Sequence, residues 1–428
     1  MNVNNERYFL NTFFTIFLFI PVALILGNFA INLTIYLLVT LILLKAFRSK
    51  DWNFLKSDLN TILFIMWIYL LLISIFFHDY NIKNLSKSFI FGINFIFCLG
   101  VAFYLKKISF DKVKFFSYIF LSITFLIYID LLYQFFNPEF KDILGFKVNT
   151  IRSYNIFNIE KLLPLRLSGP FKDELVPGFY LATIGSASIF LFYYVNNFLQ
   201  KKSYLIFLLF LNFCFIILTG ERSSTIMNVV TLLIFLIFDS KFQLKKIKYL
   251  FLIVLILGLF IKINPTTNER MNDLHDWSTR ENNFFNSFLQ TPWGKHYKTS
   301  IILIKKKPIF GTGIRTFRIE CSKDFNIEGY VLSDGCATHP HHYILEILVE
   351  TGVIFLLLFF YLIYKIIISH IKNFNHLSHG LISIFLSYLF PLRPTGAFFS
   401  SWHGSFFWIL LALIIFSLDF KVKNNEMK

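Results

Sequence analysis

Three segments that lie far apart in the sequence carry residues suited to anion binding and acid–base chemistry. The first, RLSGPFKDELVPGFYLA, contains Arg166 and Glu174, and the second, TGERSS, contains Arg222. The third, CATHPHHYILEILVETG, contains His339, His341, His342 and Glu346. Arginine makes bidentate contacts with anionic oxygens, and histidine exchanges protons near neutral pH. Brought together, such residues would suit the transfer of a group from a phosphate leaving group.

These residues also have simpler explanations. Arg222 could anchor a helix end at a membrane surface, and the histidines could cap a helix and face solvent. The histidines with Cys336 could instead bind zinc, although the CxxC and HExxH spacings are both absent from the sequence. Ser223 or Ser224 could form a hydrolytic pair with His341, but the sequence has no GxSxG motif.

The composition indicates that membrane-spanning helices must position these residues. Of the 428 residues, 56% are hydrophobic and 15% are charged, and the mean hydropathy is +0.62. Charged residues make up about a quarter of an ordinary soluble protein. A soluble enzyme, a disordered protein and a repeat solenoid are therefore excluded. The net charge of +16 could suggest nucleic acid, but basic loops in a membrane protein are first a signal of topology, so we expect no nucleic-acid partner.

Apolar runs predict an all-α, polytopic integral membrane protein with about twelve membrane-spanning helices. They lie near residues 9–26, 29–45, 60–77, 88–105, 115–136, 177–195, 203–219, 225–239, 249–263, 343–364, 379–391 and 403–419. Residues 1–428 are expected to form a single integral membrane domain. Two long segments outside the membrane interrupt it, residues 137–176 and a larger one, residues 264–342, before the last three helices.

Basic residues predict the orientation of these helices. Outside the two long segments, most Lys and Arg residues fall on the side that holds both termini. The short loops on the other side hold only Lys83, Lys87, Arg222 and Arg393. Cytoplasmic loops carry the excess of basic residues, so both termini are expected in the cytoplasm. The arginine and histidine segments would then face the outside of the membrane, which is the periplasm if this is a bacterial inner-membrane protein.

Several further residues are candidates for binding or support. Cys321 and Cys336 lie in the larger outside segment, where an oxidising compartment favours a disulfide over two free thiols. Asp130 is a carboxyl group inside an expected span, which indicates either a functional role or a hydrogen bond to a neighbouring helix. Trp402 opens the last span and could line the rim of the site. Residues 296–307 show apolar residues at helical spacing and predict an amphipathic helix on the membrane surface.

Together these segments resemble the O-antigen ligase and O-antigen polymerase superfamily of bacterial membrane glycosyltransferases. RLSGPFKDE is similar to the family's Arg-x-x-Gly-x-Phe segment, and LTGERSS to its Thr-x-Ser-Arg element. PIFGTGIRTF, followed by CATHPHHYILEILVETG, is similar to its Pro-x-x-Gly-x-Gly and His-Pro-His-Asn signatures. The resemblance covers roughly residues 130–420. Two positions differ, because His342 replaces the family's Asn and Glu221 stands where ligases often have Ser.

The resemblance implies a GT-C-like fold and glycosyl transfer without a metal or other cofactor. The donor would be a glycan on undecaprenyl diphosphate, because Arg166 and Arg222 match the family's diphosphate-binding arginines. His341 matches its catalytic histidine, which would deprotonate the acceptor hydroxyl. His339 and His342 are second choices for this base. The full set of predicted substrate-binding residues is His339, His342, Glu174, Glu346, Asp130 and Trp402.

The acceptor separates two predicted functions. A ligase would transfer the glycan to a lipid A-core, whereas a polymerase would transfer it to another repeat unit. The single large loop late in the chain favours the ligase. A transporter or flippase for lipid-linked oligosaccharides is an alternative of another class, but it would need charged residues along its helices rather than at one face. A structural scaffold would not need paired arginines with histidines.

Overall fold

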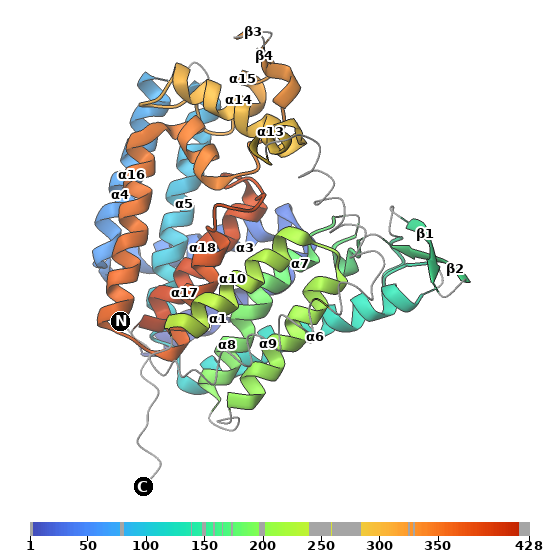
Figure 1. The fold of residues 1–428 in the computed structure, drawn as a ribbon. Helices are drawn as coiled ribbons and strands as arrows, with labels where there is room; N and C mark the ends of the chain where they lie inside the picture. Colours follow the sequence, from blue (N-terminus) through green and yellow to red (C-terminus); the bar gives the residue numbers. More distant parts are fainter. Residues whose placement is uncertain are drawn as a thin grey trace. The chain divides into compact units, whose positions relative to one another are not determined.

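The computed structural model describes residues 3–77, 81–137, 139–147, 151–156, 159–164, 166–172, 174–196, 202–238, 258, 284–323, 326–327 and 330–418. The chain divides into two compact units. The first consists of Met1–Phe110, Glu281–Ser378 and Pro391–Lys428, and the second of Asp111–Arg280 and His379–Phe390. Both units are mainly helical, as expected from the sequence (Figure 1).

The first unit combines helices from both ends of the chain. The N-terminal part contributes α1 (Val3–Leu18), α2 (Ile20–Leu26), α3 (Asn28–Ser49), the 3-10 turn η1 (Asn53–Leu55), α4 (Asp58–Phe76) and α5 (Asn81–Leu105). The later part contributes α13 (Phe284–Gln290), α14 (Pro292–Lys306), α15 (Phe317–Glu320), the hairpin β3–β4 (Asn326–Ile327 and Tyr330–Val331), η5 (Leu332–Gly335), α16 (Tyr343–Lys372) and α18 (Ser401–Leu418). Helix α4 packs against α5 and α16, and α18 packs against α3 and α5 (Figure 1).

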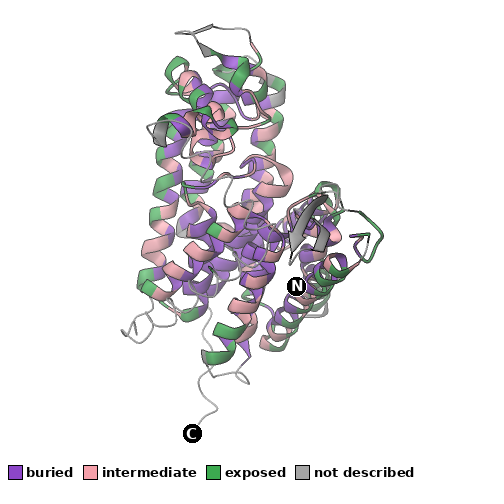
Figure 2. Ribbon diagram, turned by 45° about the vertical axis from the view of Figure 1, so that its right-hand side comes forward, coloured by how far each residue is buried: buried purple, intermediate pink, exposed green. Residues whose placement is uncertain are grey.

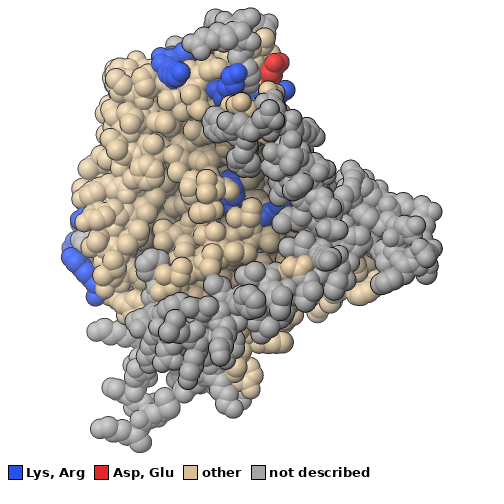
Figure 3. Space-filling view, viewed as in Figure 1, with Lys and Arg blue, Asp and Glu red and all other residues tan. Residues whose placement is uncertain are grey.

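The long helices of the first unit differ in how far they are buried. The apolar window of α18 is 89% buried, whereas those of α4 and α16 are each 39% buried. Helix α18 itself is apolar on all of its sides, which suits a helix enclosed by other helices. In contrast, α4 and α16 expose large apolar side chains such as Phe64 and Leu357. Figure 2 colours the ribbon by burial, with exposed residues in green. In Figure 3 the surface over these two helices is largely uncharged between groups of basic side chains, as expected for a belt in contact with lipid.

The membrane class predicted from the sequence is confirmed. Among the described residues, eight helices are long and apolar enough to cross a membrane. They are Asn5–Leu26, Asn28–Ser49, Leu59–Phe76, Asn84–Leu105, Phe110–Phe136, Pro177–Val195, Tyr343–Lys372 and Ser401–Leu418. Two shorter apolar helices, Ser203–Leu218 and Arg222–Ile237, match further predicted spans. The predicted span 249–263 lies, except for Gly258, outside the described residues, so the count of twelve stays a prediction.

The second unit holds the segments that carry both arginines. Its elements are α6 (Phe110–Phe136), the hairpin β1–β2 (Ile151–Ile156 and Ile159–Pro164), the 3-10 turn η2 (Gly169–Phe171), α7 (Pro177–Tyr180), the π-helical turn η3 (Leu181–Gly185), α8 (Ser186–Val195), α9 (Lys202–Leu218), α10 (Arg222–Phe238) and most of α17 (His376–Tyr388). In the antiparallel hairpin, Ile151 lies opposite Pro164 and Ile156 opposite Ile159. The all-α prediction did not include the strands of the two hairpins, β1–β2 and β3–β4.

A network of buried polar side chains supports the π-helical turn. A π-turn leaves carbonyl groups without their usual helical partners. The side-chain nitrogen of Asn212 donates to the carbonyl of Leu181 at 3.1 Å and to the hydroxyl of Ser186 at 3.1 Å. The hydroxyl of Tyr128 on α6 in turn donates to Asn212 Oδ1 at 2.7 Å. These bonds join α6, α9 and the turn into one rigid support close to α7.

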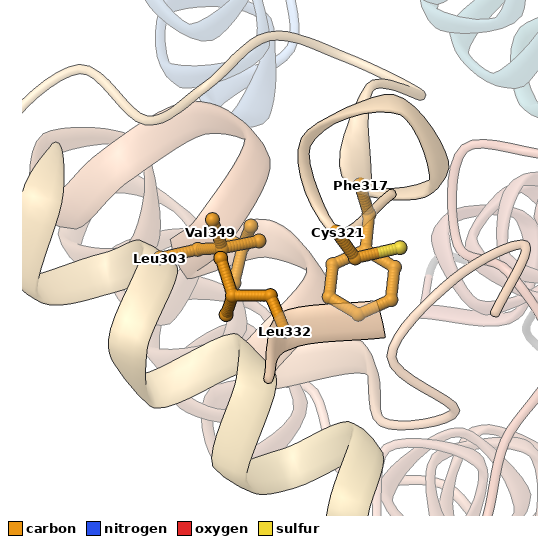
Figure 4. Close-up of a cluster of buried hydrophobic side chains, with 5 residues drawn as sticks. All are labelled: Leu303, Phe317, Cys321, Leu332 and Val349. Atoms are coloured by element: carbon orange, nitrogen blue, oxygen red, sulfur yellow. The ribbon is translucent and has the colours of Figure 1, made fainter. Parts of the chain in front are cut away.

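The segment before the histidines has its own hydrophobic core. Leu303, Phe317, Cys321, Leu332 and Val349 are all buried together (Figure 4). They come from α14, α15, η5 and α16, and the structure contains a disulfide between Cys321 and Cys336. The predicted amphipathic helix exists as α14, but its apolar face packs against η5 and α16 rather than being left for the membrane. This core orders the chain immediately before His339.

Candidate active site

A glutamine on α6 holds the segment that carries Arg166. Gln134 Oε1 accepts hydrogen bonds from the backbone N–H groups of Ser168 at 3.0 Å and Gly169 at 2.9 Å. Gly169 has a φ of 51°, a left-handed conformation that glycine adopts without strain. The N–H of Leu167 donates to the carbonyl of Thr219, at the end of the turn before α10. The two arginine-bearing segments are therefore joined through their backbones within one unit.

Glu221 connects the two arginine segments through its side chain. Its carboxylate lies 3.9 Å from Arg166 Nη2, accepts from the Gly178 N–H at 2.8 Å and accepts from the Ser224 hydroxyl at 2.7 Å. Burial raises the pKa of Glu221, and the charge of Arg166 opposes this shift. A Cβ atom on Gly178 would lie only 2.6 Å from Thr219 Oγ1, so a glycine is needed where α7 approaches this turn. The sequence analysis noted Glu221 only as a departure from the family pattern.

Arg222 is the first residue of α10, and its side chain is half-buried. The N-terminus of a helix carries a partial positive charge, which adds to that of the guanidinium group. Arg166 is also half-buried and donates a hydrogen bond to the carbonyl of Leu175. The second unit thus holds Arg166 beside the buried carboxylate of Glu221, and Arg222 begins the helix that follows directly after Glu221. Such an arrangement can hold an anion with two negative charges, such as a diphosphate.

Two other residues predicted for the site, Asp130 and Glu174, also belong to the second unit. Asp130 is buried, and its Oδ1 accepts a hydrogen bond from the Ile143 N–H at 2.7 Å, which ties the loop after α6 to the helix. Glu174 is exposed, and its backbone closes a turn with Phe171 and Val176. The histidines, in contrast, belong to the first unit, and the predicted substrate-binding roles of Asp130 and Glu174 stay predictions.

In the first unit, three imidazole rings form a cluster. The ring centroids of His339 and His341 are 4.0 Å apart, and those of His296 and His341 are 5.3 Å apart. His296 comes from α14, where its Nδ1 lies 2.9 Å from the carbonyl of Gly335. The sequence analysis missed His296, although it opens the predicted amphipathic helix. His341 is the central member of the cluster.

The segment after α17 fixes the backbone of His341. His341 has a φ of 56°, which is uncommon for a residue other than glycine. Its carbonyl accepts a hydrogen bond from the Thr395 N–H at 2.8 Å, and His339 Nε2 lies 3.2 Å from the Thr395 carbonyl. Because two backbone groups of Thr395 hold neighbouring histidines, the unusual conformation is maintained by tertiary contacts.

His342 has a different task from His341. It is the N-cap of α16, and its Nδ1 accepts a hydrogen bond from the Leu345 N–H at 3.2 Å. The helix-capping explanation considered for the cluster therefore applies to His342. A ring nitrogen used for capping is not available to accept a proton without loss of the cap.

The imidazoles of His339, His341 and His342 are held neutral near pH 7. Burial lowers the pKa of His341, and a charge on His296 lowers it further. Burial also lowers the pKa of His342, and it lowers that of His339 to about 3 with a contribution from His341. A neutral imidazole has a free lone pair on one nitrogen and can act as a general base.

Two buried glutamates on α16 hold the loops around this cluster. Glu346 accepts from the N–H groups of Phe398 at 2.8 Å and Phe399 at 3.3 Å. Glu350, one helical turn further, accepts from the N–H groups of Arg315 at 2.7 Å and Phe317 at 3.4 Å. Glu346 was predicted to bind substrate or orient the base. In the structure its carboxylate holds the segment that contains Thr395, which in turn contacts His341, and the role in substrate binding stays a prediction.

Arg393 lies in the segment that contains Thr395, and Trp402 follows that segment at the start of α18. The indole nitrogen of Trp402 donates to the carbonyl of Leu24 at 2.7 Å, which ties α18 to α2. Arg393 is only 2% exposed, and its charge contributes to lowering the pKa of His342. Sequence analysis used Arg393 only as a topology marker. Its position in a short outside loop, against the positive-inside bias, was the available signal.

The glycines of the PIFGTG element are explained by close packing against α16. Helix α16 breaks at Gly352, where φ is 79° and ψ is 178°. At the break, the Thr312 N–H donates to the Val349 carbonyl at 2.8 Å, and the Gly313 N–H donates to the Glu350 carbonyl at 3.0 Å. A Cβ atom on Gly352 would collide with the carbonyl oxygen of Ile309. This element therefore packs closely against the break in α16.

Replacing Gly352 with alanine is expected to lower the free energy of unfolding by about 2 kcal/mol or more, because it combines a strained backbone with a collision. Chemical denaturation in detergent, followed by circular dichroism, measures this loss. Gly27→Ala is the matched control, since Gly27 also has a positive φ of 97° but has no atom within 4 Å of the added Cβ. An equal loss in both variants would contradict the role of close packing.

The described residues do not support the two weaker explanations of the histidines. Among them, no group of three or more His, Cys, Asp and Glu side chains is arranged to hold a metal ion. Cys336 forms a disulfide, so its sulfur is not a thiolate ligand. The hydroxyl of Ser224 donates a hydrogen bond to the carboxylate of Glu221. This contact does not suit a nucleophile that would be paired with His341.

Comparison with known proteins supports the predicted class. Residues 205–360 match the family described as O-antigen ligase. This stretch runs from α9 into α16 and contains Arg222, the PIFGTG element and the histidine segment. The resemblance to the O-antigen ligase superfamily is thereby confirmed over that part of the chain. The match indicates a membrane enzyme of the glycosyltransferase type.

A search of solved structures matched one described as "Structural coordination of polymerization and crosslinking by a peptidoglycan synthase complex". The TM-score is 0.45 and the sequence identity is 11%, over 86% of this chain and 97% of that chain. At this level the likeness does not bear on function. No curated protein is significantly similar to this chain.

Proposed function

We propose that the protein transfers a glycan from undecaprenyl diphosphate to an acceptor hydroxyl at the periplasmic face of the bacterial inner membrane. The observation that carries this proposal is the environment of His341. Its half-buried imidazole packs against other imidazoles, its pKa is lowered, and tertiary contacts hold its backbone in an unusual conformation. Such a group suits proton abstraction from an alcohol near neutral pH.

In the proposed reaction, a ring nitrogen of His341 accepts the proton of the acceptor hydroxyl as its oxygen attacks the anomeric carbon of the glycan. The bond between that carbon and the diphosphate oxygen breaks, and the diphosphate leaves with the bonding electrons. Arg166 and Arg222 stabilise the negative charge that develops on it. The second unit supplies these two guanidinium groups without requiring a metal ion to neutralise the leaving group.

The pKa shift of His341 predicts the pH dependence of transfer. The lowered pKa keeps the base neutral below its ordinary value of about 6.5, so we expect the rate to hold as the pH falls to 6.5 and to decline only in more acid solution. His296→Asn removes the neighbouring imidazole that helps to lower the pKa of His341 and keeps a group that can donate to the Gly335 carbonyl. The pH below which the rate of this variant declines should therefore be higher than in the unchanged protein. An unchanged value in this variant would argue against His341 as the titrating base.

The acceptor proposed is a lipid A-core, which makes the enzyme a ligase. Deletion of the gene in the native host, followed by gel analysis of lipopolysaccharide, tests this proposal. A ligase predicts loss of all long glycan from the core and accumulation of lipid-linked polymer. A single repeat unit on the core would instead identify a polymerase. An unchanged lipopolysaccharide pattern, without lipid-linked glycan, would contradict both.

A further inference from the structure

The loop that follows α6 carries an exposed apolar tip flanked by two lysines. Within its described residues, 139–147, Ile143 is 57% exposed and Leu144 is 67% exposed. Lys141 and Lys147 face each other in an antiparallel bridge at the base of the tip. Neighbouring apolar side chains are unfavourable in water, and where they are exposed together they mark a contact with another molecule or with a membrane.

Hydrogen bonds give this tip a fixed shape. The Asp142 N–H donates to the Phe146 carbonyl at 3.0 Å, and the Gly145 N–H donates to the Asp142 carbonyl at 3.0 Å. Asp142 Oδ1 accepts a hydrogen bond from the Phe146 N–H at 2.7 Å. On α6, Asp130 Oδ1 accepts one from the Ile143 N–H at 2.7 Å. Backbone groups that enter the hydrocarbon of a membrane must have their partners within the protein, and these groups of the tip meet that condition.

The bond to Asp130 shows that the loop turns back along α6. Asp130 lies six residues before Phe136, the last residue of α6, which corresponds to about 9 Å along the helix axis. The Cβ atom of a helical residue also tilts toward the start of its helix, which here is away from Phe136. Because Ile143 is bonded to the Asp130 carboxylate, the tip lies beside the last turns of α6 rather than beyond its end.

The level of Asp130 falls within the apolar part of α6. The last basic residue near the start of this helix is Lys114, and a membrane span needs about 20 residues. Asp130 lies sixteen residues after Lys114, so its level is still inside the span. The same part of α6 exposes large apolar side chains on one face, at Leu126, Ile129 and Tyr133. Such a face suits contact with acyl chains at the level that the tip reaches.

We propose that residues 140–147 form a re-entrant loop and that acyl chains of the adjacent membrane leaflet cover Ile143 and Leu144. The two lysines at its base stay at the level of the lipid headgroups, as long basic side chains do at membrane interfaces. The last turns of α6 also hold the Arg166 segment, through Gln134. The immersed tip therefore fixes that segment at the membrane surface, where a lipid-linked diphosphate lies. This consequence rests on the proposed function, whereas the re-entrant loop does not.

A nitroxide label on Leu144→Cys, measured by electron paramagnetic resonance, tests the depth of the tip. The full-length protein is reconstituted into phosphatidylcholine vesicles, with the free cysteines Cys98 and Cys214 replaced by alanine. Collisions of the label with oxygen report contact with acyl chains, and collisions with a water-soluble nickel complex report contact with water. We expect an oxygen-to-nickel ratio about fivefold or more above that of Glu139→Cys, because acyl chains exclude polar solutes. Glu139 is the matched control, since it is exposed in the same loop, and a label on Ile129→Cys gives the value for lipid.

Two variants of Asp130 test whether its bond holds the tip in place. Asp130→Leu removes the acceptor of the Ile143 N–H and should lower the ratio at Leu144 about twofold or more, because an unbonded N–H is costly in hydrocarbon. Asp130→Asn keeps an acceptor oxygen and should keep the ratio. A Leu144 label with the same ratio as the Glu139 label would overturn the proposal, and so would equal ratios in the two Asp130 variants. Neither measurement depends on glycan transfer.

The consequence for Arg166 is tested by the kinetics of Leu144→Asp. A carboxylate at the tip resists immersion, so the KM for a lipid-linked donor in vesicles should rise about tenfold while kcat is unchanged. Glu139→Gln is the matched control and should leave the KM as it is. An unchanged KM in Leu144→Asp would overturn the link to Arg166. A protein whose tip is immersed but that transfers no glycan would contradict the proposed function alone.

Discussion

Replacing His341 is expected to slow glycan transfer by about 10²–10⁴-fold, the usual contribution of a general base. The acceptor hydroxyl would then lose its proton to water in the transition state instead of to a positioned imidazole. Transfer from a purified lipid-linked glycan to its acceptor, followed by gel analysis of the product, measures the rate. Because His341 has a positive φ, Asn is the better replacement, since it tolerates this conformation more readily than Ala.

A matched variant separates the loss of the imidazole from damage to the fold. His342→Asn removes a neighbouring imidazole but keeps a good N-cap for α16. We expect it to lose far less activity than His341→Asn. If the two variants lose the same activity, or if His341→Asn transfers normally, the assignment of His341 as the base is wrong. Equal thermal unfolding of both variants in detergent would show that the comparison is valid.

Replacing Arg222 with alanine is expected to reduce transfer by about 10²-fold or more, because a preorganised charge on the leaving group acts mainly in the transition state. Arg222→Lys keeps the charge but loses the bidentate geometry, so it should restore only part of the rate. The exposed Arg318 offers a matched control, because Arg318→Ala removes a guanidinium group from the first unit. A rate for Arg222→Ala equal to that of Arg318→Ala would exclude the leaving-group role.

The arginine segment depends on a residue whose importance the sequence pattern did not indicate. Glu221 was recognised only as a deviation from the family's Ser, yet its carboxylate bonds Arg166, Gly178 and Ser224. A pattern search treats such a position as noise. In the structure this one carboxylate links the two arginine segments, a contact that the spacing of residues along the chain does not reveal.

The same distinction explains the outcome for the histidines. The spacing of His339, His341 and His342 indicated a cluster but did not identify the base. The structure gives two of them different contacts: His342 caps α16, whereas the Thr395 N–H donates to the carbonyl of His341. Thr395 lies more than fifty residues further along the chain. His296 was overlooked for the same reason, since only folding brings α14 beside the cluster.

The sequence by itself determined the membrane class, most of the helices, the positions of the chemical segments and the superfamily resemblance. These follow from local properties, namely apolar runs long enough to span a bilayer and short motifs read along the chain. Tertiary structure alone decided which predicted residues have structural roles. Glu346, Asp130 and Trp402 bond to backbone groups from other segments, and Gly352 accommodates the PIFGTG element. Buried polar groups must find partners wherever the fold places them, and those partners are set by packing rather than by sequence distance.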